Sequence, residues 1–98
     1  MAMDFKKNKE KATAERKAGA SMVLDRICDE TGVDKNHLTW VQSLDDHEPK
    51  YRLRVSVGDY QHDFTFTHDG LSDYPTGHPG VDSKIDAIVH WIRTVRQI

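Results

Sequence analysis

The stretch that decides the fold is residues 51–68, which read YRLRVSVGDYQHDFTFTH. Apolar and polar side chains alternate on both sides of Gly58-Asp59, and alternation of this kind is typical of half-buried strands. A two-residue connection that begins with glycine is typical of a type I′ or II′ hairpin turn. The pattern therefore predicts a β-hairpin with strands at residues 51–57 and 60–68.

The turn also fixes the register of the predicted hairpin. Counting outward from the turn places these pairs on the apolar face: Val57 with Tyr60, Val55 with His62, Leu53 with Phe64, and Tyr51 with Phe66. The polar face receives Arg52 with Thr65, Arg54 with Asp63, and Ser56 with Gln61. A slip of one residue would move the apolar side chains to solvent. The hairpin is therefore expected to have one buried face and one solvated face.

Helical periodicity precedes and follows this hairpin. Apolar residues with helical spacing are Ala20, Val23, Leu24, Ile27 and Cys28 before it, and Ile85, Ile88, Val89, Ile92 and Val95 after it. Gly32 is the expected left-handed residue that ends the first helix. Asp82 or Ser83 is the expected N-cap of the last helix, whose stripe is flanked by Trp91.

Two further segments complete the predicted order of elements. Residues 38–44 predict a first strand that places Leu38, Trp40 and Leu44 on one face. Residues 69–80 are rich in Gly, Pro and Ser, and they predict a long loop before the last helix. The fold is therefore expected to be α+β with the order α-β-β-β-α, in which two helices pack on one face of a three-stranded antiparallel meander.

Length and charge suggest one domain with an arm. The 98 residues suffice for one modest core. Residues 1–17 are rich in Lys, Ala and Glu and lack an apolar stripe, so we expect a basic arm, flexible or helical, ahead of a single domain at residues 18–98. The first 20 residues hold six Lys or Arg and three Asp or Glu, whereas the whole chain has a net charge of −2. The domain itself is therefore acidic.

Location and assembly are constrained only coarsely. No run approaches the roughly 18 apolar residues of a membrane-spanning helix, so no membrane partner is expected. The N-terminal residues contain no apolar segment typical of a secretory signal. The single cysteine, Cys28, cannot form an internal disulfide, which favours a cytoplasmic location. Both a monomer and a homodimer are compatible with the sequence.

The sequence contains no recognisable catalytic motif. Cys28 lies on the core stripe of a predicted helix, and Ser72 and Ser83 lack a G-x-S-x-G setting. We therefore expect a protein that is not an enzyme and that carries no cofactor. A metal site formed by His62, His68 and His78 is an alternative, because zinc sites combine histidine with carboxylates, although the chain has no H-x-x-x-H or C-x-x-C pair.

The order of elements in residues 20–98 is similar to that of the double-stranded RNA-binding domain. The resemblance implies phosphate contacts by basic residues at the start of the last helix, where this chain reads Asp82-Ser83-Lys84-Ile85-Asp86. The first turn, Asp45-Asp46-His47-Glu48, would repel phosphates. Direct nucleic-acid binding is therefore a second alternative, and its candidate residues are Lys6, Lys7, Lys9, Lys11, Arg16 and Lys17 in the arm with Arg52 and Arg54 in the sheet.

The leading hypothesis is a small non-catalytic protein-interaction module that acts as an inhibitor or adaptor. An acidic domain favours a basic partner surface, such as that of a nucleic-acid-processing protein, and tyrosine is enriched at interface centres. The predicted interface residues are Tyr74 and His78 in the 69–80 loop, with Asp45, Asp46, Glu48 and Asp73 as a charged rim. Packing of Tyr74 over the edge of the core is an equally compatible prediction.

Overall fold

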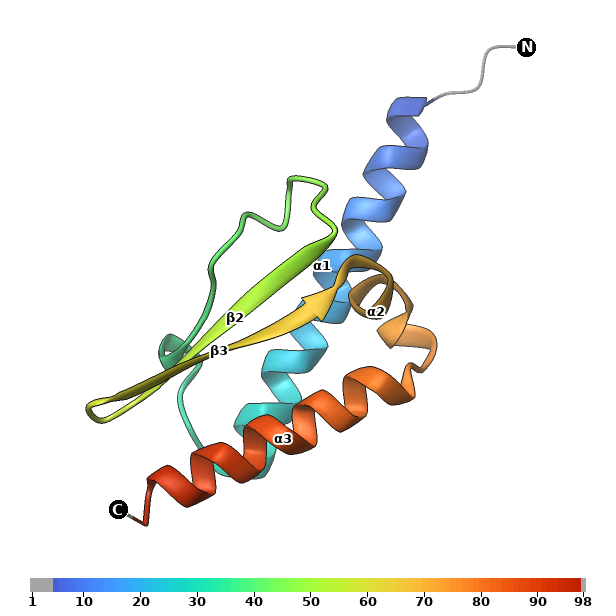
Figure 1. The fold of residues 1–98 in the computed structure, drawn as a ribbon. Helices are drawn as coiled ribbons and strands as arrows, with labels where there is room; N and C mark the ends of the chain where they lie inside the picture. Colours follow the sequence, from blue (N-terminus) through green and yellow to red (C-terminus); the bar gives the residue numbers. More distant parts are fainter. Residues whose placement is uncertain (1–4, 98) are drawn as a thin grey trace.

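The computed structural model describes the backbone of residues 5–97 and the side chains of residues 10–97. Its elements, shown in Figure 1, are α1 (Phe5–Thr31), the 3₁₀ helix η1 (Lys35–His37), β1 (Leu38–Trp40), β2 (Lys50–Val57), β3 (Tyr60–Thr67), α2 (His68–Asp73), the 3₁₀ helix η2 (Tyr74–Thr76) and α3 (Pro79–Val95). The predicted α-β-β-β-α order is confirmed, with the short helix α2 added between β3 and α3.

The predicted hairpin is confirmed pair for pair. Strands β2 and β3 are antiparallel, and their register runs from Val57 opposite Tyr60 to Tyr51 opposite Phe66. Gly58 has a φ angle of +58°, and among the described residues only glycines have positive φ. A type I′ turn requires positive φ at both central residues, so the turn at Gly58-Asp59 is type II′.

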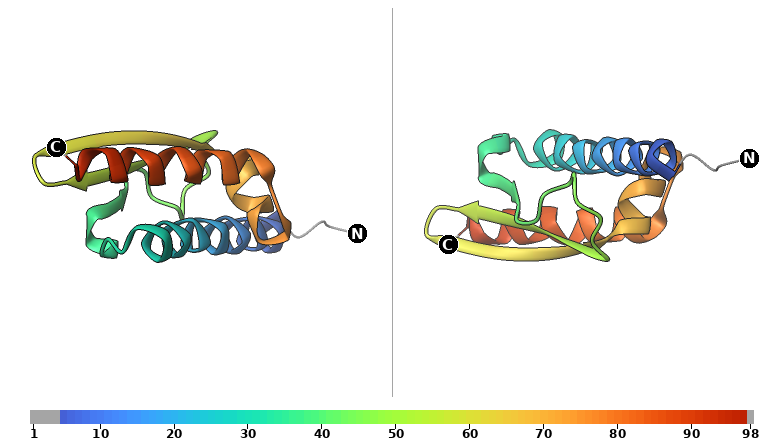
Figure 2. Two further views of the ribbon diagram at one scale, coloured as in Figure 1. Left: turned by 90° about the horizontal axis from the view of Figure 1, so that it is seen from below. Right: turned by 90° about the horizontal axis from the view of Figure 1, so that it is seen from above.

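The sheet has β2 at its centre, with β1 and β3 at its edges. Its inward face is buried at the end away from the hairpin tip, since Tyr51, Leu53 and Val55 are fully buried and Phe66 is 2% exposed. Toward the tip, Tyr60 and His62 on the same face are exposed. Figure 2 shows α1 behind the sheet and α3 running beside β3. The described part of the chain places no helix over the outward face, which accounts for the polar residues that alternate with the core positions on β2 and β3.

Strand β1 is shorter than the predicted strand at 38–44. Its pairing with β2 ends where Trp40 faces Leu53. The backbone N–H of Val41 still donates to the carbonyl of Arg52 at 2.9 Å. The N–H of Arg52 donates instead to the side-chain oxygen of Gln42, at 2.8 Å. The Gln42 side chain thus accepts the hydrogen bond that a backbone carbonyl of a longer β1 would accept. Residues 41–49 then leave the sheet.

The two predicted helical stripes form the core. Ala20, Val23 and Ile27 of α1 are at most 1% exposed, and the α3 stripe is also buried, at Ile85, Ile88, Val89, Ile92 and Val95. Leu24, Cys28 and Trp91 pack against this core while half-buried. The helix stripes and the inward sheet face therefore bury one another, as the periodicity predicts.

The C-terminal end of α1 is stabilised by Gly32, which follows it, and by two arginines at the C-terminal end of α3. Gly32 has a φ angle of +76°, and its N–H donates to the carbonyl of Cys28 at 2.7 Å, which confirms the predicted left-handed end. Arg93 donates to the carbonyl of Glu30 at 3.1 Å, and Arg96 donates to that of Thr31. These carbonyls lie in the last turn of α1 and lack helical partners, so the arginines stabilise the end of a neighbouring helix.

The prediction of a long loop at 69–80 is wrong. Thr67 caps α2 by accepting a hydrogen bond from the N–H of Gly70 at 3.0 Å, and η2 follows directly. Helix α3 also begins before the predicted Asp82 or Ser83, because His78 is its N-cap and its Nδ1 accepts from the N–H of Val81 at 3.1 Å. Only residues 77 and 78 connect η2 to α3.

Candidate protein-interaction site

Arg16 is buried although it lies in the predicted basic arm. Helix α1 continues without a break through residue 17, and Arg16 is only 1% exposed. Its Nε and Nη2 donate to the carbonyl of Leu44 at 2.9 and 2.6 Å. Its guanidinium carbon lies 5.4 Å from the centre of the Tyr51 ring. Arg16 therefore packs against the body of the fold, and its buried side chain is not available to a phosphate.

Within the described residues, the charged side chain of Arg16 is stabilised by hydrogen bonds and not by an ion pair with a carboxylate. Among the described residues, the ion pairs do not include Arg16. Its remaining partners are Thr13 Oγ1 at 3.3 Å and His68 Nδ1, which lies 3.3 Å from Nη1. Burying a charge is costly unless it is hydrogen-bonded. The burial of Arg16 therefore depends on its contacts with Leu44, Tyr51 and His68 together.

Tyr51 fixes the turn that follows Leu44. Its ring is fully buried, and its hydroxyl accepts from the backbone N–H of Glu48 at 2.8 Å and donates to the carbonyl of Asp46. The side chains of Asp46 and Glu48 remain exposed. A buried tyrosine thus holds the backbone of the turn and leaves its carboxylates free to contact another molecule.

The same turn lies against the start of α2. The rings of His47 and His68 meet edge to face, with their centres 4.5 Å apart. The N–H of His68 donates to the carbonyl of Pro49 at 3.1 Å. His47, Pro49 and His68 line an open hollow of about 350 Å³ together with Thr67 and Asp69. The turn and α2 therefore form one continuous surface.

Burial and nearby charge disfavour the protonated form of His68. The pKa of its imidazole is lowered from the ordinary value of 6.5, first by burial and then by His47 and Arg16. The carboxylates of Asp69 and Asp73 act in the opposite direction. The lowered pKa shows that burial, His47 and Arg16 together outweigh the two acids.

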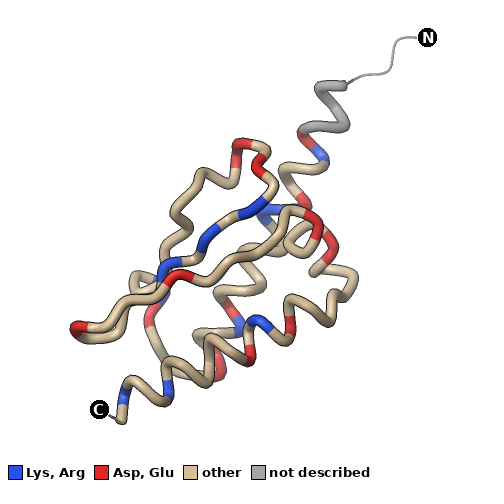
Figure 3. Tube along the Cα trace, viewed as in Figure 1, with Lys and Arg blue, Asp and Glu red and all other residues tan. Residues whose placement is uncertain are grey.

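Exposed carboxylates gather where these two segments meet. We call this surface the acidic end and define it by Asp45, Asp46, Glu48, Asp69 and Asp73, all of which are exposed. Figure 3 shows acidic positions on the turn and on α2 at the same end of the molecule, away from the hairpin tip. The four predicted rim residues thus lie on the two segments that meet here: Asp45, Asp46 and Glu48 on the turn, and Asp73 at the C-terminal end of α2.

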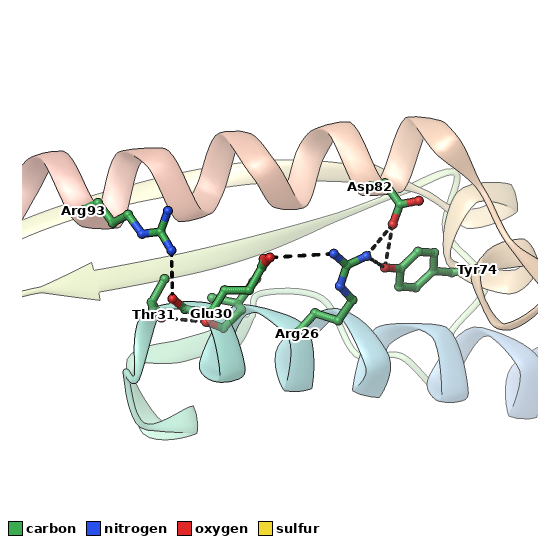
Figure 4. A network of polar contacts seen from close by, with 7 residues as sticks. Arg26, Glu30, Thr31, Tyr74, Asp82 and Arg93 are labelled. Atoms are coloured by element: carbon green, nitrogen blue, oxygen red, sulfur yellow. Dashed lines mark hydrogen bonds and ion pairs between the residues drawn. The ribbon is translucent and has the colours of Figure 1, made fainter.

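Tyr74 does not lie on this surface, nor on any exposed loop. It is 5% exposed and belongs to a polar network between α1 and α3 (Figure 4). Its hydroxyl donates to Asp82 Oδ1 at 2.8 Å and accepts from Arg26 Nη1 at 2.8 Å. Burial, and then the bond to Asp82, raise its pKa above 10.0. Of the two predicted placements of Tyr74, packing at the core is the one observed.

His78, the other predicted loop residue, has a structural role. It is half-buried, and its Nδ1 caps α3 through the bond to Val81. The N-cap bond occupies Nδ1 of the ring and leaves Nε2 as its other polar atom. The predicted interface residues therefore divide into an acidic set that comes together and a pair, Tyr74 and His78, that stabilises the fold.

The predicted nucleic-acid residues do not form one free basic surface. Lys17 pairs with Asp45, and Lys11 lies 4.0 Å from Glu15. The side chains of Lys6, Lys7 and Lys9 lie outside the described residues. On the outward sheet face, Arg54 binds both carboxylate oxygens of Asp63, at 3.0 and 3.1 Å, and Arg52 lies 4.0 Å from the same carboxylate. The predicted cross-strand pair of Arg54 with Asp63 is thus confirmed, and Arg54 lowers the pKa of Asp63.

The histidines proposed as metal ligands make different contacts in the structure. His62 is exposed beside Phe64 and Trp91, with its ring centre 4.6 and 5.8 Å from theirs, whereas His68 contacts Arg16 and His78 caps α3. A search of the described residues gives no group of three or more His, Cys, Asp or Glu side chains suited to a metal ion. The one cysteine, Cys28, is half-buried, and burial raises the pKa of its thiol.

No protein-family model, curated protein or solved structure matches the chain. Within the described residues, no helix is both long and apolar enough to cross a bilayer.

Proposed function

We propose that the protein is a non-catalytic protein-interaction module, an inhibitor or adaptor that presents its acidic end to a basic surface of another protein. The observation that carries the proposal is the way in which buried residues hold the acidic turn. Arg16 binds its Leu44 carbonyl, Tyr51 binds its backbone at residues 46 and 48, and His68 binds its Pro49 carbonyl. A surface fixed in this way loses little conformational entropy when it binds.

The acidic end also has carboxylates available for a partner. Among the ion pairs of the described residues, only Asp45 of this set takes part, with Lys17. Asp46, Glu48, Asp69 and Asp73 are exposed and have no ion pair in that part of the chain. Carboxylates at the rim of an interface accelerate and orient association with a basic surface. A basic nucleic-acid-processing protein of the cytoplasm fits this chemistry, whereas the phosphates of a nucleic acid do not.

A charge-reversal pair tests this proposal. The double variant Asp46→Lys with Glu48→Lys is expected to weaken binding of the native partner at least about tenfold, the equivalent of about 1.4 kcal/mol, because two attractive charges become repulsive. The partner would first be captured from a host extract with wild-type protein and identified by mass spectrometry. The dissociation constant would then be measured with the purified partner at two salt concentrations.

The matched control is the double variant Asp59→Lys with Asp86→Lys. Both residues are exposed and lie outside the acidic end, so the change in net charge is the same while the position differs. The control is expected to bind almost as tightly as the wild type. Equal losses in both variants, or no loss in the Asp46→Lys, Glu48→Lys variant, would show that the acidic end is not the interface.

A further inference from the structure

We propose that protonation of His68 releases the 41–49 segment from α1 and α2, so that the acidic end keeps its shape only while this imidazole is neutral. The release is a property of the fold itself. Its effect on a partner rests on the proposed function of the acidic end. The inference follows from three observations: a buried cation that has no ion pair within residues 10–97, the ring nitrogen that this cation contacts, and the contacts through which both residues hold the segment.

The contact with Arg16 fixes the tautomer of His68. A guanidinium has only N–H groups and cannot accept a hydrogen bond. The 3.3 Å approach of Arg16 Nη1 to His68 Nδ1 therefore requires an unprotonated Nδ1, with the ring proton on Nε2. In this form the ring accepts from a buried cation and contributes to its solvation.

A second proton on the ring would turn this contact from attractive to repulsive. An N–H of His68 would then face an N–H of Arg16, and two positive charges would lie side by side in a partly buried setting. The charged or titratable groups that face the ring are Arg16 of α1, His47 of the turn, and Asp69 and Asp73 of α2. The two carboxylates are exposed, so solvent weakens their opposing effect.

The 41–49 segment would be loosened because several of its links to the body run through these two residues, beside those made by Tyr51 and by the pair of Lys17 with Asp45. Arg16 holds the Leu44 carbonyl. His68 holds the Pro49 carbonyl through its N–H and the His47 ring through its own ring. The β-hairpin has a separate support in the long ladder between β2 and β3. Charge on His68 is therefore expected to loosen the segment while the sheet remains intact.

The direction of the pH dependence follows from proton linkage. The folded protein lowers the pKa of His68 below its ordinary value of 6.5, so the released state binds the extra proton more readily. We call the contact of residues 41–49 with α1 and α2 the junction. The contribution of His68 to the stability of the junction is complete above the ordinary pKa of histidine. It is lost progressively as the pH falls below that value toward the lowered pKa. Mild acid is therefore expected to open the junction.

Nuclear magnetic resonance of the intact protein tests the proposal. At neutral pH, the ring nitrogens of His68 should show the Nε2–H tautomer. On acidification from about pH 8 to about pH 5, the range in which histidine titrates, the ring should titrate below its ordinary pKa. In the same step, amide protection factors should fall at residues 46, 48 and 68 and stay constant in β2 and β3.

Three variants distinguish this mechanism from general acid sensitivity. His47→Gln is expected to raise the pKa of His68, because His47 lowers it. Asp69→Asn is expected to lower the pKa of His68, because Asp69 raises it. His68→Gln should make the protection of residues 46 and 48 independent of pH. A protonated Nδ1 at neutral pH, a His68 ring that titrates at its ordinary value, or unchanged protection through the titration would overturn the proposal.

Binding to the partner provides a separate outcome. If the acidic end is the interface, affinity should fall across the titration in the wild type and remain constant in His68→Gln. If the junction opens in acid and the affinity does not change, the proposed interface is contradicted. The protonation mechanism of His68 is supported in that case. A junction that does not open would overturn the protonation mechanism whatever the result of the charge-reversal experiment.

Discussion

Tyr74→Ala is expected to lower the free energy of unfolding by about 3–5 kcal/mol, the usual cost of removing a large buried aromatic side chain. The ring is 5% exposed and belongs to the core cluster. Its removal would leave a cavity between α1 and α3, and Asp82 and Arg26 would lose a shared partner. Urea unfolding followed by circular dichroism measures the change.

Tyr74→Phe separates the ring from the hydroxyl. The ring would remain packed, and the loss should be about 0.5–1.5 kcal/mol, the net worth of a typical hydrogen bond. Arg26 and Asp82 still contact each other at 2.7 Å, which limits the damage. Partner affinity should be unchanged in both variants under conditions in which they are folded. A stable Tyr74→Ala protein with weakened binding would instead place Tyr74 in the interface.

Residues 51–68 could be predicted in detail because their information is local. Alternation fixes which side chains face inward, and Gly58 fixes where the chain reverses, so every pair follows by counting. The helix stripes are predictable for the same reason, since 3.6-residue periodicity depends only on neighbours along the chain. These segments together determine the α+β fold.

The segment that forms α2 and η2 carries a much weaker local signal for helix. Helix α2 spans only His68–Asp73, which is too short for a periodic pattern. Gly70, Pro75 and Gly77 favour a loop by composition. The available signal was Thr67, an N-cap residue followed by Gly70 at the position that donates to it. Once this region is helical, Tyr74 is carried into the core rather than to the tip of a loop.

The site could be predicted only in part because its assembly depends on contacts between distant residues. The acidic residues were identifiable from composition, but their junction depends on Arg16, whose partners Leu44 and His68 lie 28 and 52 residues away in the sequence. A lone arginine among the lysines of α1 has no pattern that marks it as buried. Gly19 was a better clue, since an isolated glycine within a helix often has a packing role.

Gly19→Ala is expected to destabilise the protein by about 3 kcal/mol or more, beyond the usual range for overpacking. A Cβ atom at this position would lie 1.7 Å from the carbonyl oxygen of Leu71 and 2.7 Å from its carbonyl carbon. These are backbone atoms of α2, so no rotation of a side chain can relieve the clash. Thermal and urea unfolding of the variant measure the effect.

The sign of this effect makes the test decisive. In an exposed helix interior, replacing glycine with alanine stabilises by about 1 kcal/mol, so helix propensity alone predicts the opposite result. Ser21→Ala, an exposed position in the same helix, should follow propensity and change stability only slightly. A Gly19→Ala protein that is more stable than the wild type would show that α1 and α2 are not in close contact.

A double variant locates the clash. Leu71→Ala removes a fully buried side chain but leaves the carbonyl oxygen that the new Cβ would strike. Gly19→Ala combined with Leu71→Ala should therefore show no rescue, and the two losses should approximately add. A double variant more stable than Gly19→Ala alone would assign the conflict to the Leu71 side chain. Because α2 also carries His68, any shift that accommodates the Cβ should disturb the junction with residues 41–49, and amide exchange at residue 68 would report it.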